Sequence, residues 1–578
     1  MGNSQPNMQQ TGITPEEGKT YHTGFELDLK DELERCRYWF YAAGMTPPHH
    51  PHKPLEDYLF LYFANRGFVK AHSKLSLPHC LTGQSHRSWK GYQFIRATLV
   101  LSDEEAKKRT EKYREALREI IENFDELWSK VKEERLKVYE KYKQFDYEYA
   151  SNVDLVDLVD NIKDEVDVEQ MVHHMYFMDG LGAVYLLFVE TCQQLLGIDD
   201  KDPLFLAAIT GFTHKVFEVE EGYKQLAKEA EQAGLKDLIS GTPIDEVLPQ
   251  LERTESGRQW SKRFHDFQWE NAWRPLIKFH CSAESWVEKP SVALEVIKGY
   301  FGTPLRSLEE VRVEKVKERE RAERELLSRV PAERRATFEA LMRMAQKAGA
   351  WFEEHDFYHE SYQFSVGGYA YRRVGRRLQQ WGCIDDGNDI FFLIPDEIIR
   401  LLASPEEYSA KALVRRRKAE YEENCQVVPP PFVGTASLEE AGRLLFQSGC
   451  ASLSLTAIGE LPQPRPELQA DLIGLPASPG VAEGIARVIY VWEELPQVQK
   501  GEILVAPATS PDWIYIWPYI RAVVVDVGGI LIHAAIVSRE FGIPCVTNVR
   551  TGTRTIKTGQ TIKVDGNAGA VWILDKEK

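Results

Sequence analysis

Residues 528–544 read GGILIHAAIVSREFGIP, and this stretch decides how the C-terminal part of the chain folds. Two glycines precede His533, an amphipathic helical pattern follows it, and Gly542-Ile-Pro ends that pattern. The spacing therefore predicts a helix that begins near His533. The exposed N–H groups and the dipole of such a helix end favour an anion. A neutral imidazole there can accept a phosphoryl group, and the helix end would stabilise the added charge.

The flanking sequence predicts an α/β unit around His533. Residues 521–526 form a short β-branched apolar run typical of a buried strand, and residues 544–549 form a second one. Residues 559–566 indicate the start of a hairpin. A strand, a Gly-Gly turn and a helix in this order present the turn to a ligand. The alternative is an ordinary histidine of an α/β domain, which is the better reading for a histidine without such surroundings.

Four motifs between residues 476 and 574 resemble, in the same order, the swivelling phosphohistidine domain of the phosphoenolpyruvate-utilising enzymes. They are PASPGVAEGIARV at 476–488, VAPATSPDW at 505–513, the 528–544 run quoted above, and VDG at 564–566. Four ordered motifs are a more specific signal than any one pattern. The resemblance implies a mobile α/β domain in which His533 is the residue that is phosphorylated.

One position departs from that family. A small hydroxyl residue often precedes the histidine there, where it would cap the helix or bond the phosphate, and this chain has Ile532. Without the hydroxyl, the phosphate would depend on the backbone N–H groups of Gly528 and Gly529 and on the Arg539 side chain.

Composition limits the class of protein. The chain has 578 residues, a length typical of two to four domains, and its net charge of −17 argues against nucleic acid as a partner. The eight cysteines include no CxxC pair, so neither a zinc site nor a disulfide framework is indicated and no metal ligands are expected. The longest apolar stretch, around residues 180–189, is too short to cross a bilayer, and the polar N-terminus lacks a signal peptide. We expect a cytoplasmic protein with no membrane partner.

The chain is predicted to be multidomain, with a large, mostly α-helical domain followed by a small α/β swivelling phosphohistidine domain. Long helical periodicity over residues 102–147 begins the helical part. Further helical blocks are predicted over residues 153–196, 203–233, 244–251, 256–272 and 307–347, the last broken near Pro331. No run of alternating strands is apparent before residue 470.

Four segments follow from this pattern. They are a disordered tail over 1–22, a helical substrate-binding domain over 23–425, a proline-rich linker over 426–475 and the swivelling domain over 476–578. Proline-rich segments act as semi-rigid spacers, which suits a domain that must travel between two sites.

Two histidine-rich places in the helical region have alternative interpretations. Residues 47–54 read PPHHPHKP and must be a loop; the three histidines are metal-ligand candidates, but a rigid exposed turn fits better because no carboxylate or cysteine completes the set. His173 and His174 lie in an apolar helix and are a second, weaker candidate for a functional site. A core pair with satisfied hydrogen bonds is the favoured interpretation.

Residues 351–360, WFEEHDFYHE, are the best candidate for activating a substrate. In an α-helix His355 and His359 share a face, as do Asp356 and Glu360. Phosphorylating a hydroxyl needs a base for its proton, or a charge pair that holds it. The residues predicted to orient or deprotonate the acceptor are Glu354, His355, Asp356, His359 and Glu360. The alternative is a solvated face of ion pairs, or a cluster that bridges helices.

Three helical segments resemble the substrate-binding domain of the rifamycin phosphotransferases and their synthase-like relatives. These are residues 264–274, SWVEKP at 285–290, and residues 376–393, the last being the most specific. Most of the aromatic residues of this region are expected to pack in the core, and some are candidates to line an apolar substrate pocket.

The sequence contains no GxxxxGK[ST] run, nothing like the family's ATP-grasp domain, and no room for its phosphoenolpyruvate-binding barrel. The resemblance therefore implies that a separate ATP-grasp subunit binds ATP and Mg²⁺, as in phenylphosphate synthase. We expect a phosphotransferase subunit that carries a phosphoryl group on His533 to a hydroxyl acceptor, a phenol or similar aromatic alcohol. The alternatives are a rifamycin-type or other alcohol phosphotransferase, and a catalytically silent regulatory protein, which Ile532 favours.

Overall fold

The computed structural model describes residues 38–99, 102–302, 308–430, 432–459, 462 and 464–575. The tail predicted over residues 1–22 lies outside these ranges. Within them, the predicted fold class is confirmed, with a large helical region followed by a C-terminal α/β domain.

The helical region is built largely from the predicted blocks. Its long elements are α2 (Pro54–Leu75), α3 (Asp103–Lys143), α4 (Asn152–Ile162), α5 (Glu169–Leu196), α7 (Lys215–Gln232), α10 (Glu255–Asn271), α12 (Leu308–Arg329), α13 (Arg335–His355), α14 (Tyr362–Gln380) and α16 (Lys411–Cys425). Shorter helices are α6 (Pro203–Ala208), α8 (Lys236–Gly241), α9 (Val247–Leu251), α11 (Ser291–Tyr300) and α15 (Pro395–Ala403). Two π-helical turns, η2 (Lys163–Val168) and η5 (Asp356–Ser361), join α4 to α5 and α13 to α14. The side chain of Ser102 caps α3 by accepting a hydrogen bond from the Glu105 N–H.

Residues 152–196 are long and apolar enough to cross a membrane by length and composition alone. However, 67% of their most apolar window is buried inside the fold. This stretch therefore has the character of a core helix.

A four-stranded antiparallel sheet that the sequence did not predict accompanies these helices. It contains β1 (Tyr38–Tyr41), β2 (Cys80–Trp89), β3 (Tyr92–Leu99) and β4 (Phe432–Gly434) in the order β2-β3-β1-β4. Lys90 and Gly91 connect β2 to β3 with φ values of 53° and 80°, the conformation of a tight hairpin turn. Gln84, His86 and Ser88 are buried along β2, so polar residues occupy the face where apolar ones would signal a strand.

The segment predicted as a linker over 426–475 is partly folded onto the helical region. It contains β4, which pairs with β1, then α17 (Leu438–Gln447) and a π-helical turn η7 (Leu453–Ala457). The described part of this segment, which reaches β5 (Leu472–Ile473), therefore contains folded elements, and a role as a tether stays a prediction.

The C-terminal domain forms an eight-stranded mixed sheet. Besides β5 it contains β6 (Leu475–Ser478), β7 (Val481–Val488), β8 (Ile503–Ala506), β9 (Ala522–Val525), β10 (Cys545–Thr547), β11 (Thr561–Asp565) and β12 (Ala570–Ile573), in the order β5-β12-β11-β7-β8-β9-β10-β6. The strands β7, β8, β9 and β10 are parallel neighbours. The predicted strand, helix and strand appear as β9, α18 (His533–Phe541) and β10.

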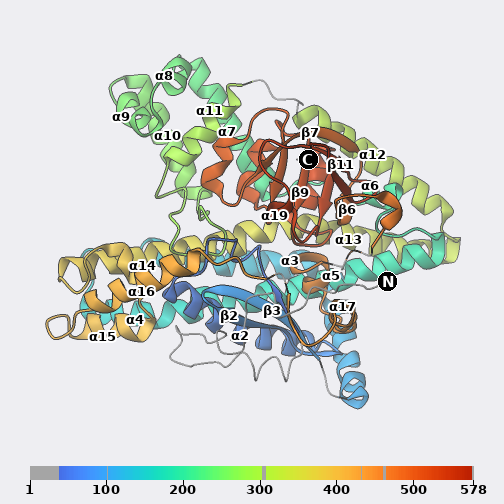
Figure 1. The fold of residues 1–578 in the computed structure, drawn as a ribbon, viewed down its shortest axis with the longest axis horizontal. Helices are drawn as coiled ribbons and strands as arrows, with labels where there is room; N and C mark the ends of the chain where they lie inside the picture. Colours follow the sequence, from blue (N-terminus) through green and yellow to red (C-terminus); the bar gives the residue numbers. More distant parts are fainter. Residues whose placement is uncertain are drawn as a thin grey trace.

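Alternate residues of β8 and β9 pack into two different hydrophobic cores. Leu504 and Val523 join the large core that is continuous with the helical region, whereas Val505 and Val524 pack in a smaller core on the opposite face of the sheet. Figure 1 shows the C-terminal domain, in red, on one side of the long helices α13 and α14, with the blue strands β2 and β3 on the other side. The two domains are therefore docked, with α18 against α12 and α13.

Candidate functional site

His533 is the first residue of α18, as the sequence predicts. Ile532 occupies the N-cap in an extended conformation, and its side chain makes no capping hydrogen bond. Gly528 has φ 104°, and a Cβ added there would lie 2.7 Å from the Ile532 side chain. The turn thus requires a glycine at 528, because of its positive φ and the close approach of the Ile532 side chain.

The imidazole of His533 is enclosed by both domains. Its Nδ1 lies 2.8 Å from Oε2 of Glu353, near the end of α13, and the two side chains are 2% and 0% exposed. The ring of Trp517 packs edge-on at 5.2 Å between centroids. Among the residues that the structure describes, none forms a hydrogen bond with His533 Nε2. Nδ1 is therefore hydrogen-bonded to a carboxylate, and Nε2 has no hydrogen-bond partner among the described residues.

The state of Glu353 follows from its neighbours. Burial alone raises the pKa of this carboxyl, but the electrostatic interaction and hydrogen bond with His533, together with the nearby imidazoles of His214 and His355, outweigh it and hold the pKa below its ordinary value. An ionised Glu353 accepts a hydrogen bond from the Nδ1–H of His533. That contact selects the tautomer whose Nε2 carries the lone pair.

The sequence prediction included Glu354 but not Glu353. Glu354 accepts hydrogen bonds from Trp128 Nε1 and Lys132 Nζ, both at 3.0 Å, on the side of α13 that faces α3. Glu353 was missed because its role depends on how α13 meets another domain. Nothing in the order of the two glutamates signals which of them faces α18.

His533 lines a cavity of about 140 Å³ together with three of the predicted acceptor-activating residues, His355, Asp356 and Glu360. His174 and Lys278 add polar groups to the same wall. Most of the remaining lining is apolar and includes Phe60, Phe68, Met171, Met175, Met178, Phe279 and Phe352. The structure thus places the histidine beside an apolar cavity that has one charged wall.

The π-helical turn η5 changes which residues share a face. In a π turn the hydrogen bonds run from i to i+5, so residues five apart come together. His355 Nε2 accordingly lies 3.8 Å from Glu360 Oε1. His359 instead packs its ring against Trp128, at 5.1 Å between centroids, and does not line the cavity. The predicted i,i+4 pairing of His355 with His359 is therefore replaced by an i,i+5 pairing with Glu360.

Lys278 holds the two carboxylates of this wall. Its Nζ lies 2.8 Å from Asp356 Oδ2 and 2.7 Å from Glu360 Oε2. Burial raises the pKa of Asp356 well above its ordinary value. Burial also acts to raise the pKa of Glu360, but the Lys278 charge outweighs it and holds that pKa well below its ordinary value. Two neighbouring carboxyls with separated pKa values can hold a proton on one and a charge on the other.

The residues predicted to steady a phosphate have structural partners in the docked conformation. The Gly529 N–H donates to the Thr456 carbonyl at 3.0 Å. Arg539 is buried and donates to the carbonyls of Ala477 and Ile530, both at 2.9 Å. Gly528 lines the cavity. Their role toward a phosphate stays a prediction.

The other histidine candidates are spread apart. His174 lines the cavity, and burial lowers its pKa to about 3, while its neighbour His173 is half-buried outside the cavity lining. In the predicted proline-rich loop, His49 Nδ1 lies 2.8 Å from the Cys425 carbonyl and His52 Nε2 lies 3.1 Å from the Phe279 carbonyl. Those two histidines connect the loop to neighbouring backbone carbonyls.

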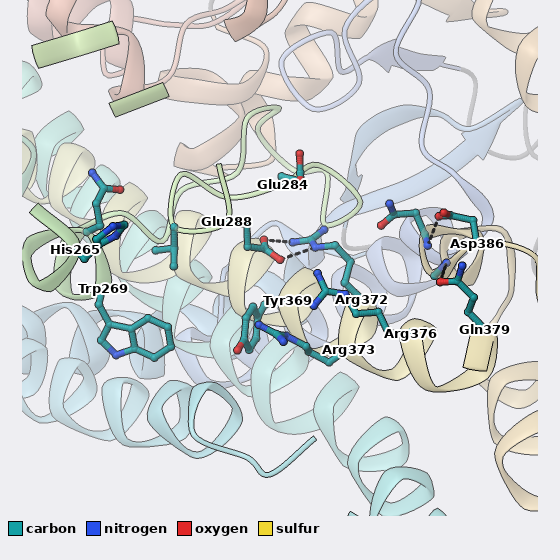
Figure 2. Close-up of a pocket in the computed structure, with 14 residues that line it drawn as sticks. His265, Trp269, Glu284, Glu288, Tyr369, Arg372, Arg373, Arg376, Gln379 and Asp386 are labelled. Atoms are coloured by element: carbon teal, nitrogen blue, oxygen red, sulfur yellow. Dashed lines mark hydrogen bonds and ion pairs between the residues drawn. The ribbon is translucent and has the colours of Figure 1, made fainter. Parts of the chain in front are cut away.

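A second cavity of about 520 Å³ lies between α10 and α14 (Figure 2). Arg372 there is bound by Glu288, while Arg373 stacks its guanidinium over Tyr369 at 4.6 Å from the ring centroid. The three segments that resemble the rifamycin phosphotransferases, at 264–274, 285–290 and 376–393, all contribute to its lining. The resemblance therefore follows a surface of the fold distinct from the cavity at His533.

Comparison with known proteins finds two matching regions in the chain. Residues 498–569 match the mobile domain of the PEP-utilising enzymes, and residues 172–354 match the fourth domain of rifampicin phosphotransferase. His533 lies in the first match and Glu353 in the second, so the contact between them joins the two regions.

Several curated relatives cover more than half of the chain. An uncharacterized phosphotransferase, YvkC, of Bacillus subtilis is 27% identical over 374 residues, which cover 64% of this chain and 43% of that protein. Rifampicin phosphotransferase of Streptomyces sviceus is 26% identical over 347 residues, covering 58% of this chain and 37% of the relative. Chondramide synthase CmdD of Chondromyces crocatus is 29% identical over 399 residues, covering 67% of this chain and 10% of the relative. The chain thus spans less than half the length of these relatives.

Two separate parts of the chain therefore resemble known phosphotransferase-family domains, the mobile domain of the PEP-utilising enzymes and, upstream of it, the fourth domain of rifampicin phosphotransferase.

Proposed function

We propose that this chain is a phosphotransferase component that carries a phosphoryl group on Nε2 of His533 and passes it to a hydroxyl acceptor in the adjoining cavity. The observation that supports this most is the shared cavity, because the buried Nε2 has no hydrogen-bond partner among the described residues and the charged wall lies opposite an apolar lining. Glu353 orients the ring through Nδ1 and balances the positive charge that develops on it.

The transfer step uses groups that line the cavity. The acceptor oxygen attacks phosphorus, the bond between phosphorus and Nε2 breaks, and the imidazole leaves with its lone pair restored on Nε2. The hydroxyl proton passes to a carboxylate of the Asp356–Glu360 pair. Lys278, which contacts both carboxylates, supplies positive charge on the side where the phosphoryl oxygens develop negative charge.

The size and lining of the cavity favour a phenol or a similar aromatic alcohol as the acceptor. An apolar cavity of about 150 Å³ in a protein core holds a benzene ring. The 140 Å³ cavity, lined by phenylalanine and methionine, therefore suits a single aromatic ring better than a large macrocycle. A larger alcohol of the rifamycin type is the second candidate, supported by the homologous fourth domain.

We also propose that ATP and Mg²⁺ act through a separate ATP-grasp subunit that phosphorylates His533. In support of this, the sequence has no GxxxxGK[ST] run, and residues 498–569 match the mobile domain of the PEP-utilising enzymes. A neighbouring gene for an ATP-grasp protein would identify the subunit.

The test is reconstitution of the chain with that subunit, ATP and Mg²⁺ and a panel of acceptors. We expect phosphorylation of phenols, less of larger alcohols, and none with His533→Ala. A phosphotransferase activity that His533→Ala retains in full would contradict the mechanism. Phosphate that reaches His533 and passes to none of the acceptors would instead support a regulatory protein.

A further inference from the structure

Three potential metal ligands converge beside the cavity at His533. They are His174 Nε2 from α5, His355 Nε2 from the end of α13, and Glu360 Oε1 from η5, and all lie within 4.8 Å of one another. The three side chains are 5%, 5% and 9% exposed. Buried imidazoles and carboxylates require partners, so this convergence needs an explanation.

Hydrogen bonds among the three side chains do not explain this convergence. Glu360 Oε1 lies 3.7 Å from His174 Nε2 and 3.8 Å from His355 Nε2. Both distances exceed the range of N–H···O hydrogen bonds. By contrast, two ligands bound at about 2.1 Å to one tetrahedral metal ion lie about 3.4 Å apart. Small side-chain adjustments would bring all three atoms to an ion placed between them.

Outer contacts orient two of these ligand atoms, those of His355 and Glu360, toward the third. His355 Nδ1 lies 3.1 Å from the Trp351 carbonyl, so it donates its N–H there and Nε2 keeps its lone pair. Glu360 uses its other oxygen, Oε2, for Lys278, which leaves Oε1 facing the two imidazoles. The π-helical turn makes the arrangement possible, because it brings positions 355 and 360 to the same side.

We propose that His174, His355 and Glu360 bind a divalent transition-metal ion such as Zn²⁺, Mn²⁺ or Co²⁺. Two imidazoles and one carboxylate suit such ions and leave further coordination positions open. All three residues line the cavity, so the open positions face the space where an acceptor would lie. A role for the ion in binding the acceptor oxygen rests on the function proposed above; metal binding itself does not.

The test is titration of the purified chain, freed of metal by a chelator, with Co²⁺ by absorption spectroscopy and with Zn²⁺ by calorimetry. We expect one equivalent of each ion to bind. His174→Ala, His355→Ala and Glu360→Gln should each weaken binding at least about tenfold. His173→Ala, on the neighbouring position of α5, and His533→Ala should bind as the unmodified chain does. Circular dichroism melting curves of all variants identify any that fail to fold.

A second buried group, His72, Asp179 and Cys450, is the matched control for location. Cobalt that stays bound in all three cavity variants but is lost from Cys450→Ser would overturn the proposal. So would the absence of saturable binding to the folded, unmodified chain. Neither result would affect the test of phosphotransfer, because that test depends on His533 and requires no metal at this site.

Discussion

Glu353 and Glu354 are neighbours in α13, yet their carboxylates face different parts of the molecule. Glu353 contacts the imidazole of His533, whereas Glu354 contacts Trp128 and Lys132. The pair therefore offers a matched comparison at the scale of single residues.

We predict that Glu353→Gln lowers the rate of phosphotransfer between about 10²- and 10⁴-fold, because the amide neither selects the Nδ1–H tautomer nor balances the charge on the ring. Glu354→Gln should change the rate less than about threefold, since its partners lie away from the cavity. Single-turnover kinetics with phosphorylated chain measure the difference. Equal losses in the two variants would show that the contact with His533 does not matter to the reaction.

For single residues, the sequence predicted those that belong to a local motif. His533 followed from glycines, a helix and flanking strands that are adjacent in sequence. Lys278 and His174 line the cavity and Glu353 contacts His533, each from a separate segment, so their positions depend on packing that no local pattern specifies. His355, Asp356 and Glu360 were predicted as a group, but on the geometry of an α-helix rather than of a π turn.

At the scale of elements, the turn before α18 and the π-helical turn η7 fit closely. The Gly529 N–H donates to the Thr456 carbonyl, and the Leu531 N–H donates to the Leu455 carbonyl at 3.1 Å. A Cβ on Gly529 would lie 2.3 Å from the Leu455 carbonyl oxygen. A glycine is therefore needed at 529 for the close approach of two backbones.

We predict that Gly529→Ala destabilises the chain by about 1–3 kcal/mol, because the backbone of η7 must move to admit the methyl group. Gly367→Ala in α14 is the control, since a Cβ there meets no atom within 4 Å and alanine favours a helix. Urea denaturation measures both variants. A Gly529→Ala chain as stable as the control would show that η7 and the turn are not held together in solution.

The long helices and the strands around His533 were predictable because each carries a clear hydrophobic period. The four-stranded sheet was not, since polar Gln84, His86 and Ser88 are buried on β2 and β4 is only three residues long. The prediction of a linker over 426–475 included folded residues for a related reason. The prolines suggested a spacer, but Phe432 and Val433 pair with β1.

At the scale of the whole molecule, the C-terminal domain shares a large apolar core with the helical region, and buried polar contacts add to it. Glu540, in α18, accepts hydrogen bonds from the Gly211 N–H at 2.8 and 2.9 Å. Burial raises the pKa of this carboxyl to about 7. A carboxyl free in solvent has a pKa near 4.3, so the docked state binds the proton more tightly than the undocked state.

The sign of the pH effect follows directly. Between about pH 4.3 and 7 the undocked chain loses the Glu540 proton first, so rising pH weakens docking across this window and has little further effect above it. We predict that the docked fraction, measured by energy transfer between dyes on the two domains, falls across this range relative to Glu540→Gln. His214, whose pKa burial lowers to about 4, acts in the opposite direction and is common to both proteins. Parallel pH curves for the two proteins would contradict the assignment.

The central claim is that His533 carries the phosphoryl group, and one measurement tests it most directly. The chain is incubated with its ATP-grasp partner, Mg²⁺ and ATP labelled in its phosphates, and the modified residue is located by mass spectrometry. The account predicts one acid-labile, base-stable phosphate on His533 that disappears when the acceptor is added. Phosphate on another residue, or product formed by His533→Ala at the full rate, would contradict it.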